Sequence, residues 1–172
     1  LGSPFGAPIW LEGIPSYAFT VLCVVAAVNA FNMLDGMDGL AGALAVIALA
    51  AIAVLAFQSG DVVVLSISTI IIGAVLAFLL SNLPFEFNRV VRCFMGDSGS
   101  TLLGISVAWL CIEISQGSSA GAKPITMLWI LAIPIYELFW TVMRRAARGI
   151  PPFRSDYGHF HHLVLRAGFG IR

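Results

Sequence analysis

Five apolar stretches, each close to the length that crosses a bilayer, constrain this chain more than any other feature. A spanning α-helix requires about 20 apolar residues, and the first three stretches contain no charged residue. Only 10% of the 172 residues are charged, against about 25% in a typical soluble domain. The sequence therefore predicts an all-α, polytopic transmembrane bundle that forms one region over residues 1–172. The predicted spans are Pro15–Met33, Leu40–Phe57, Val62–Ser81, Gly99–Ser115 and Pro124–Val142.

The fifth stretch differs from the others because a proline lies inside it. Pro134 has no backbone N–H, and a proline ring clashes with the carbonyl four residues earlier, so we predict a kink. Lipid-embedded helices tolerate this where neighbouring groups satisfy the freed carbonyl. Glu137 lies in the same stretch, after Pro134 and two turns before Arg144 and Arg145. It either pairs with these cations or lies beside a site.

The cations are distributed very unevenly between the two sides that this topology creates. Eight of the nine fall in or beside the loops 34–39, 82–98 and 143–172, and only Lys123 falls on the other side. Because cytoplasmic loops of membrane proteins carry an excess of Lys and Arg, the cation-rich side is predicted to be cytoplasmic. The loops on that side also hold most of the polar residues, which suggests a site there. The eight cations are Arg89, Arg92, Arg144, Arg145, Arg148, Arg154, Arg166 and Arg172.

Net charge and cysteine content exclude several classes of function. The formal net charge is zero, so the chain has no general attraction for nucleic acid. Cys23, Cys93 and Cys111 are scattered and form no CxxC pair. A disulfide framework or a cysteine zinc site is therefore not predicted.

The first polar cluster lies at the end of the first predicted span. Asn29, Asn32, Asp35 and Asp38 recur every three residues and would form one broad polar stripe on a helix. Two carboxylates and two amides offer the oxygen ligands that hard cations prefer. A solvated helix end is the alternative, but polar groups at membrane depth are costly and usually functional. The spacing does not match an EF-hand loop.

The second cluster comes directly before the fourth predicted span. Asp97 stands at the expected N-cap position, and Gly-Ser-Gly-Ser then opens a helix. The free N–H groups of such a helix start bind phosphate readily. Asp97 serves here either as a helix cap or as a metal ligand, and its spacing alone does not separate the two roles.

The third cluster places three histidines within four residues, at positions 159, 161 and 162. His159, His161 and His162 are able to bind a transition metal or phosphate oxygens, or they belong to a solvated loop. Arg148 and Arg154 nearby would supply bidentate contacts to phosphate. Arg148, with Arg144 and Arg145, is alternatively only a topology anchor. Carboxylates and amides elsewhere favour Mg²⁺, with Mn²⁺ as the alternative.

Taken together, three motifs resemble those of the polyprenyl-phosphate N-acetylhexosamine-1-phosphate transferases, over about Asn29 to Phe169. They are Asn-Ala-Phe-Asn-Met-Leu-Asp-Gly-Met-Asp-Gly-Leu-Ala-Gly from Asn29, Phe-Met-Gly-Asp-Ser-Gly-Ser from Phe94 and His-Phe-His-His from His159. The last is similar to the histidine box of the GlcNAc-1-phosphate branch. Tyr157 stands where that branch often carries Arg, which leaves the sugar open.

The resemblance implies an enzyme that transfers a sugar-1-phosphate, GlcNAc-1-phosphate in that branch, from a UDP-N-acetylhexosamine to undecaprenyl phosphate. UMP leaves, and the product initiates a cell-envelope glycan. The implied setting is the bacterial inner membrane, in contact with membrane lipid, with catalytic loops facing the cytoplasm. The phospho-MurNAc-pentapeptide transferase of peptidoglycan synthesis is the alternative branch. Both a monomer and a homodimer stay open.

The resemblance also implies a role for each polar residue. Asp97 and Asn32 would bind Mg²⁺, and Asp35 and Asp38 would organise the metal–diphosphate region or the uridine side. Asn29 would line the nucleotide pocket. The remaining residues, which would contact phosphate or the sugar, are His159, His161, His162, Arg148 and Arg154.

Two features lead us to expect the middle to C-terminal catalytic part of a longer protein. The chain begins Leu-Gly-Ser rather than with Met. Relatives carry an earlier half with an Asp-Asp pair and continue with further spans, so we expect this part alone to be inactive. A transporter is the rival class, but its charges would continue across the bilayer, and here the first three spans have none. An inactive structural subunit is the third alternative.

Overall fold

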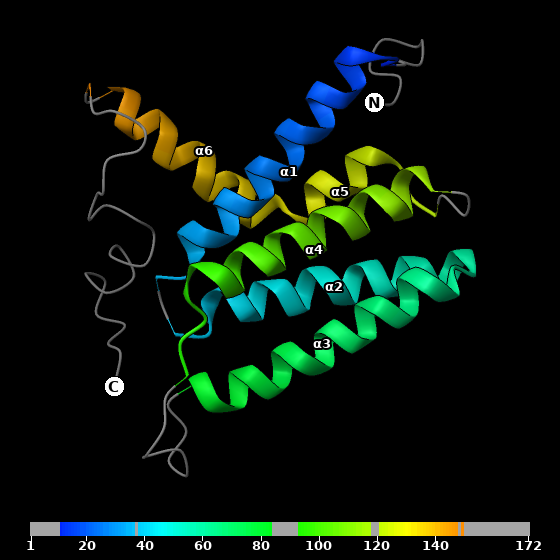
Figure 1. Cartoon of the computed structure of the whole chain (residues 1–172), viewed down its shortest axis with the longest axis horizontal. Coiled ribbons are helices and arrows are strands. Elements are labelled where there is room, and N and C mark those ends of the chain that lie inside the picture. Colours follow the sequence, from blue (N-terminus) through cyan, green and yellow to red (C-terminus); the bar gives the residue numbers. More distant parts are fainter. Residues whose placement is uncertain (1–10, 37, 84–92, 118–120, 148, 150–172) are drawn as a thin grey trace.

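The structure is a computed structural model that describes residues 11–36, 38–83, 93–117, 121–147 and 149. All regular secondary structure in these ranges is α-helical (Figure 1). This confirms the predicted all-α class. The helices are α1 (Ile14–Leu34), α2 (Leu40–Ser59), α3 (Val62–Asn82), α4 (Gly96–Gln116), α5 (Pro124–Ile130) and α6 (Ala132–Ala147).

Four helices, α1 to α4, are long and apolar enough to cross a membrane, and they coincide with the first four predicted spans. Their ends follow local chemistry. Gly60 ends α2 with a left-handed φ of 74°, which glycine adopts without a Cβ clash. The Asp61 carboxylate then caps α3 by accepting the Val64 N–H at 3.0 Å, so α2 and α3 form a tight hairpin.

The fifth predicted span is two helices rather than one, with α5 and α6 bent by 75° at their junction. The break at Leu131 comes directly after Ile130, whose carbonyl stands four residues before Pro134 and would clash with its ring. The predicted kink is therefore confirmed, and it is sharp enough to interrupt the helix. Counted together, the pair has the length and composition for a fifth crossing.

The helices pack in two main pairs, α2 with α3 and α1 with α4, while α6 also lies on α1 (Figure 1). Small residues allow the close approach that helix association in lipid requires. A Cβ at Gly104 of α4 would lie only 2.7 Å from the Val28 Cα of α1. The two backbones therefore touch at this point.

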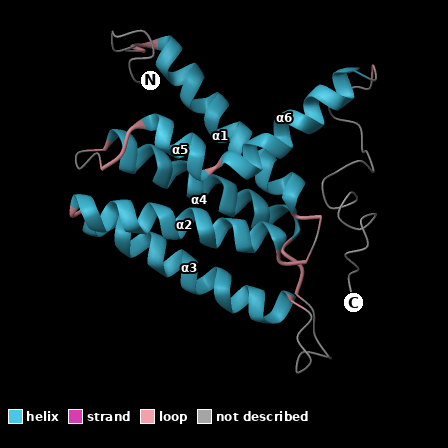
Figure 2. Cartoon of the chain, turned by 180° about the vertical axis from the view of Figure 1, so that it is seen from behind, coloured by secondary structure: helices cyan, strands magenta, loops and turns pink. Residues whose placement is uncertain are grey.

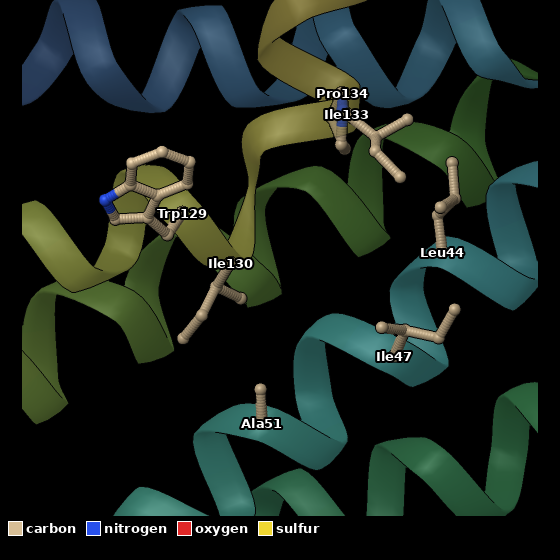
Figure 3. A pocket seen from close by; sticks show the side chains of 7 residues that line it. All are labelled: Leu44, Ile47, Ala51, Trp129, Ile130, Ile133 and Pro134. Atoms are coloured by element: carbon tan, nitrogen blue, oxygen red, sulfur yellow. The ribbon is translucent and has the colours of Figure 1, made fainter.

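A small apolar hollow lies between α2 and the α5–α6 bend (Figure 3). Its volume is ≈ 200 Å³, and its walls carry no carboxylate, amide or imidazole. It is chemically unlike the polar ends of the helices. Its lining residues are Leu44, Ile47, Ala51, Trp129, Ile130, Ile133 and Pro134.

Candidate active site

One end of the bundle gathers the C-terminal ends of α1 and α3 and the N-terminal ends of α2 and α4 (Figure 2). The antiparallel pair α1 and α4 forms its centre. Gly104 meets Val28 within the bundle, Ser100 meets Asn32 one turn nearer the end, and Gly96 meets Asp35 at the end itself. This register places the Asn29–Asp35 segment beside the Gly96–Thr101 segment, although nearly 70 residues separate them.

Asn32 is joined to α4 by the shortest polar contact of the site. The Ser100 hydroxyl donates to the Asn32 Oδ1 at 2.5 Å, and the Thr101 hydroxyl approaches the same oxygen at 3.4 Å. Ser100 is completely buried, whereas Asn32 is half-buried. Asn32 therefore has one side fixed against α4 and another open to the end of the bundle.

Asp35 is the C-cap residue of α1, just beyond the spanning segment. Burial and the neighbouring carboxylate of Asp97 raise its pKa, and Asp38 adds a smaller increase. A hydrogen bond from the Gly96 N–H acts in the opposite direction. These influences place Asp35 close enough to Asp97 and to Asp38 to be repelled by each, which is an arrangement that a cation would relieve.

Asp97 lies in the first turn of α4 and is exposed. The predicted N-cap position is wrong, because α4 begins at Gly96 rather than Gly99 and Met95 is the N-cap residue. Gly96 itself has a left-handed φ of 64°, which glycine adopts without a Cβ clash, and the right-handed turn follows it. A carboxylate in the first turn is stabilised by the helix dipole, and the capping alternative for Asp97 is removed.

The predicted helical stripe of four polar residues is correct only for Asn29 and Asn32. Helix α1 ends at Leu34, and half-buried Asp38 lies in the turn that leads to α2. Gly39 ends that turn with a φ of 78°, a conformation that L-residues avoid. Asn29 is exposed and donates from Nδ2 to the Val25 carbonyl at 2.7 Å, so its Oδ1 points away from its own helix backbone.

Asn82, at the end of α3, was given no role by the sequence. Its Nδ2 donates to the Cys93 carbonyl at 2.8 Å, while the Cys93 N–H reaches the Ser81 carbonyl at 3.4 Å. This clamp fixes the chain three residues before Gly96. Asn82, Ser100 and Thr101 are the residues that sequence reasoning missed; Ser100 and Thr101 lay beside Asp97 in the second cluster, but their partner on α1 was not visible there.

Glu137 lies on a buried polar face of α6, together with Thr141 and Arg145. These residues are spaced by four, so they share one side of the helix, and α6 packs on α1. The predicted alternatives for Glu137, a pairing role or a place beside the site, both stay open.

Several predicted site residues lie outside the residues that the structure describes. They are His159, His161, His162, Arg148 and Arg154, and the roles expected of them stay predictions. Within the described ranges, no three His, Cys, Asp or Glu side chains gather as a metal site. A cation bound there would need the amide of Asn32, water or substrate oxygens in addition to carboxylate.

The fold and the site define a class: a polytopic helical membrane protein with carboxylates and an amide at one end of its bundle. The chain belongs to glycosyl transferase family 4, whose model matches residues 1–115. It is 39% identical over 172 residues to the undecaprenyl-phosphate alpha-N-acetylglucosaminyl 1-phosphate transferase of Yersinia pestis, covering 100% of this chain and 47% of that protein.

Relatives of the same name show similar identity over shorter stretches. The Salmonella typhi protein is 45% identical over 101 residues, covering 59% of this chain and 27% of that protein. The Haemophilus influenzae protein is 40% identical over 118 residues, or 69% of this chain and 33% of that protein. The chain thus spans less than half the length of these relatives.

Proposed function

We propose that this chain is the catalytic part of an enzyme that transfers GlcNAc-1-phosphate from UDP-GlcNAc to undecaprenyl phosphate. The observation that carries the proposal is the antiparallel α1–α4 pair, which brings Asn32, Asp35 and Asp97 together at one end of the bundle. The names of the relatives support the donor sugar and the lipid acceptor.

The reaction is a phosphoryl transfer. An oxygen of the lipid phosphate attacks the β-phosphorus of the UDP-sugar, the bond from that phosphorus to the bridging oxygen breaks, and UMP leaves. Positioning and neutralisation of charge dominate such chemistry. The rigid α1–α4 register supplies the positioning. The residues proposed to contact the nucleotide, phosphate or sugar are Asn29, His159, His161, His162, Arg148 and Arg154.

The donor set fits Mg²⁺, with Mn²⁺ as a substitute. The Asp35 carboxylate, repelled by Asp97 and by Asp38, lies near an amide oxygen, and this set matches a hard cation, which is usually held by one or two carboxylates, water and substrate phosphate. Asp97 and Asn32 are the proposed ligands, and Asp35 and Asp38 complete the negative surroundings. When bound, the cation neutralises charge on the diphosphate. The Gly96 N–H holds the Asp35 carboxylate in place at this end of the bundle.

The site is proposed to face the cytoplasm of a bacterial inner membrane. Arg144 and Arg145 lie in the last turn of α6, and eight of the nine cations of the sequence belong to the predicted cytoplasmic side. The positive-inside rule supports this orientation. It would also put the carboxylates where soluble nucleotide sugars are available, with the acceptor phosphate at the membrane surface.

The test uses the full-length protein in detergent with undecaprenyl phosphate. UMP release is measured with UDP-GlcNAc, with UDP-MurNAc-pentapeptide and with UDP-N-acetyl-6-deoxyhexoses, before and after chelation of divalent cations. The expected result is a preference for UDP-GlcNAc, loss of turnover on chelation and recovery with Mg²⁺. Preference for the peptide donor would assign the chain to the peptidoglycan branch, and unchanged turnover in Asp97→Asn would remove the role given to Asp97.

A further inference from the structure

We propose that Ser100 is a positioning residue that fixes the Asn32 amide and thereby sets the affinity of the site for divalent cations. The inference rests on the metal site of the proposed function. It assigns a role to a residue that contacts neither substrate nor cation and acts through Asn32.

The direction of the Ser100 hydroxyl follows from its distances. A serine has one hydroxyl proton to donate. The Asn32 Oδ1 lies at 2.5 Å, whereas the two acceptors within its own helix, the carbonyls of Gly96 and Asp97, lie at 3.2 and 3.3 Å. The usual O–H···O distance is about 2.5–3.0 Å, so only Asn32 is within the favourable range.

This hydrogen bond determines which atom of the amide faces α4. An amide offers an oxygen with two lone pairs and an NH₂ group that only donates. If the amide were reversed, the short hydrogen bond from Ser100 would be lost, because an NH₂ group has no lone pair to accept it. Ser100 therefore holds the carbonyl oxygen in one place.

The same oxygen keeps capacity for a cation. Ser100 occupies one lone pair at 2.5 Å, and the Thr101 hydroxyl makes only a long second hydrogen bond at 3.4 Å. Mg²⁺ would take the place of this weaker Thr101 contact. Metal ligands are commonly oriented by such outer contacts, and removing one typically lowers metal affinity about 10–100-fold.

The place of Ser100 in the bundle suits this role. It lies one turn deeper than Asp97 on α4, as Asn32 lies one turn deeper than Asp35 on α1, and the next turn inward is the backbone contact of Gly104 with Val28. Ser100 is completely buried. The donor of the bond is thus buried, one turn from the closest contact of the helix pair.

The test measures cation binding without turnover. Mn²⁺ is titrated into the full-length detergent-solubilised protein, and free Mn²⁺ is followed by electron paramagnetic resonance. Ser100→Ala is expected to weaken Mn²⁺ binding on the order of tenfold. Ser100→Cys replaces the hydroxyl with a weaker hydrogen-bond donor. Its Mn²⁺ affinity should therefore lie between those of the parent protein and Ser100→Ala. Ser98→Ala is the matched control, because Ser98 is an exposed serine of the same helix turn, and it should bind Mn²⁺ like the parent protein.

A double mutant separates positioning from general damage. If Ser100 acts through Asn32, then Ser100→Ala should weaken binding no further once Asn32→Ala is present. Additive losses would overturn the inference, as would parental Mn²⁺ affinity in both Ser100 variants. By contrast, failure of the parent protein to bind Mn²⁺, or parental affinity in Asp97→Asn, would overturn the metal site of the proposed function itself.

Discussion

Gly104 is the position at which one added methyl group should disturb the site most. In Gly104→Ala the new Cβ would lie 2.7 Å from the Val28 Cα, 3.2 Å from the Val28 N and 3.3 Å from the Ala27 carbonyl oxygen. Carbon atoms normally approach to about 3.5–4.0 Å. All three neighbours are backbone atoms, so no side chain can rotate away, and α1 and α4 must separate by about 1 Å.

That separation would act on catalysis as well as stability. The Asn32–Ser100 contact of 2.5 Å lies one turn away and would stretch towards the limit of hydrogen bonding. Overpacking of this kind costs about 1–3 kcal/mol, and a displacement of about 1 Å at a catalytic group lowers the rate by up to about 10²-fold. We therefore expect Gly104→Ala to lower kcat/KM by between ten- and a hundredfold on this scale, together with a lower Tm.

The assay is UMP release by the full-length protein, with thermal unfolding measured in the same detergent. Gly73→Ala is the matched control, because Gly73 lies inside α3 and a Cβ there would meet no atom within 4 Å. It should leave kcat/KM and Tm at parental values or above. Parental activity and stability in Gly104→Ala would refute the argument that this backbone contact sets the register of the site.

Three further predictions address the stability of the site and the bend beside it. Asn82→Ala removes the hydrogen bond to the Cys93 carbonyl from a side chain that is only 4% exposed, and it should lower the free energy of unfolding by about 1–3 kcal/mol; an unchanged denaturant midpoint would contradict the clamp. Asp35→Asn should raise Tm at neutral pH while it lowers activity, because the raised pKa means that folding disfavours the charged carboxylate. This increase in Tm should shrink as the pH falls through the pKa of Asp35 in the folded protein, and it should vanish below the ordinary pKa of 3.8. An increase in Tm that persists in acid would contradict this explanation. Pro134→Ala should return an N–H to α6 and reduce the 75° bend, measurable as a longer distance between spin labels at Ile125 and Ala146; an unchanged distance would show that packing of α6 on α1 maintains the bend.

The positions of the helices could be predicted because each follows from local sequence. Apolar length defines α1 to α4, and Pro134 defines the break after α5. The size of the bend was not predictable, since it depends on how α6, with its buried Glu137 and Arg145, packs on α1. The helical stripe was wrong from Asp35 onward for a local reason: Asp35 is the C-cap of α1, and Gly39 adopts a left-handed φ of 78° before α2.

The sequence singled out three polar residues that the structure places at one end of the bundle, but it did not predict their contacts. Asn32, Asp35 and Asp97 were identified by their residue types and spacing, and the structure brings them to one end of the bundle. Ser100 was not identified, because a serine inside a Gly-Ser-Gly-Ser run has no visible partner until the register of α1 and α4 is known. That register depends on Gly104, which carries no chemical signal of its own.

The electrostatics of this helix pair explain why the site needs both helices. The C-terminal end of α1 carries negative dipole charge and three nearby carboxylates, so by itself it would repel a nucleotide diphosphate. Antiparallel packing sets the positive N-terminal end of α4 beside it, and the Gly96 N–H binds Asp35 there. A divalent cation bound there would offset part of the negative charge of these carboxylates. Cation binding and diphosphate binding should therefore depend on each other, and a titration of UDP-GlcNAc binding against Mg²⁺ should show the reciprocal coupling.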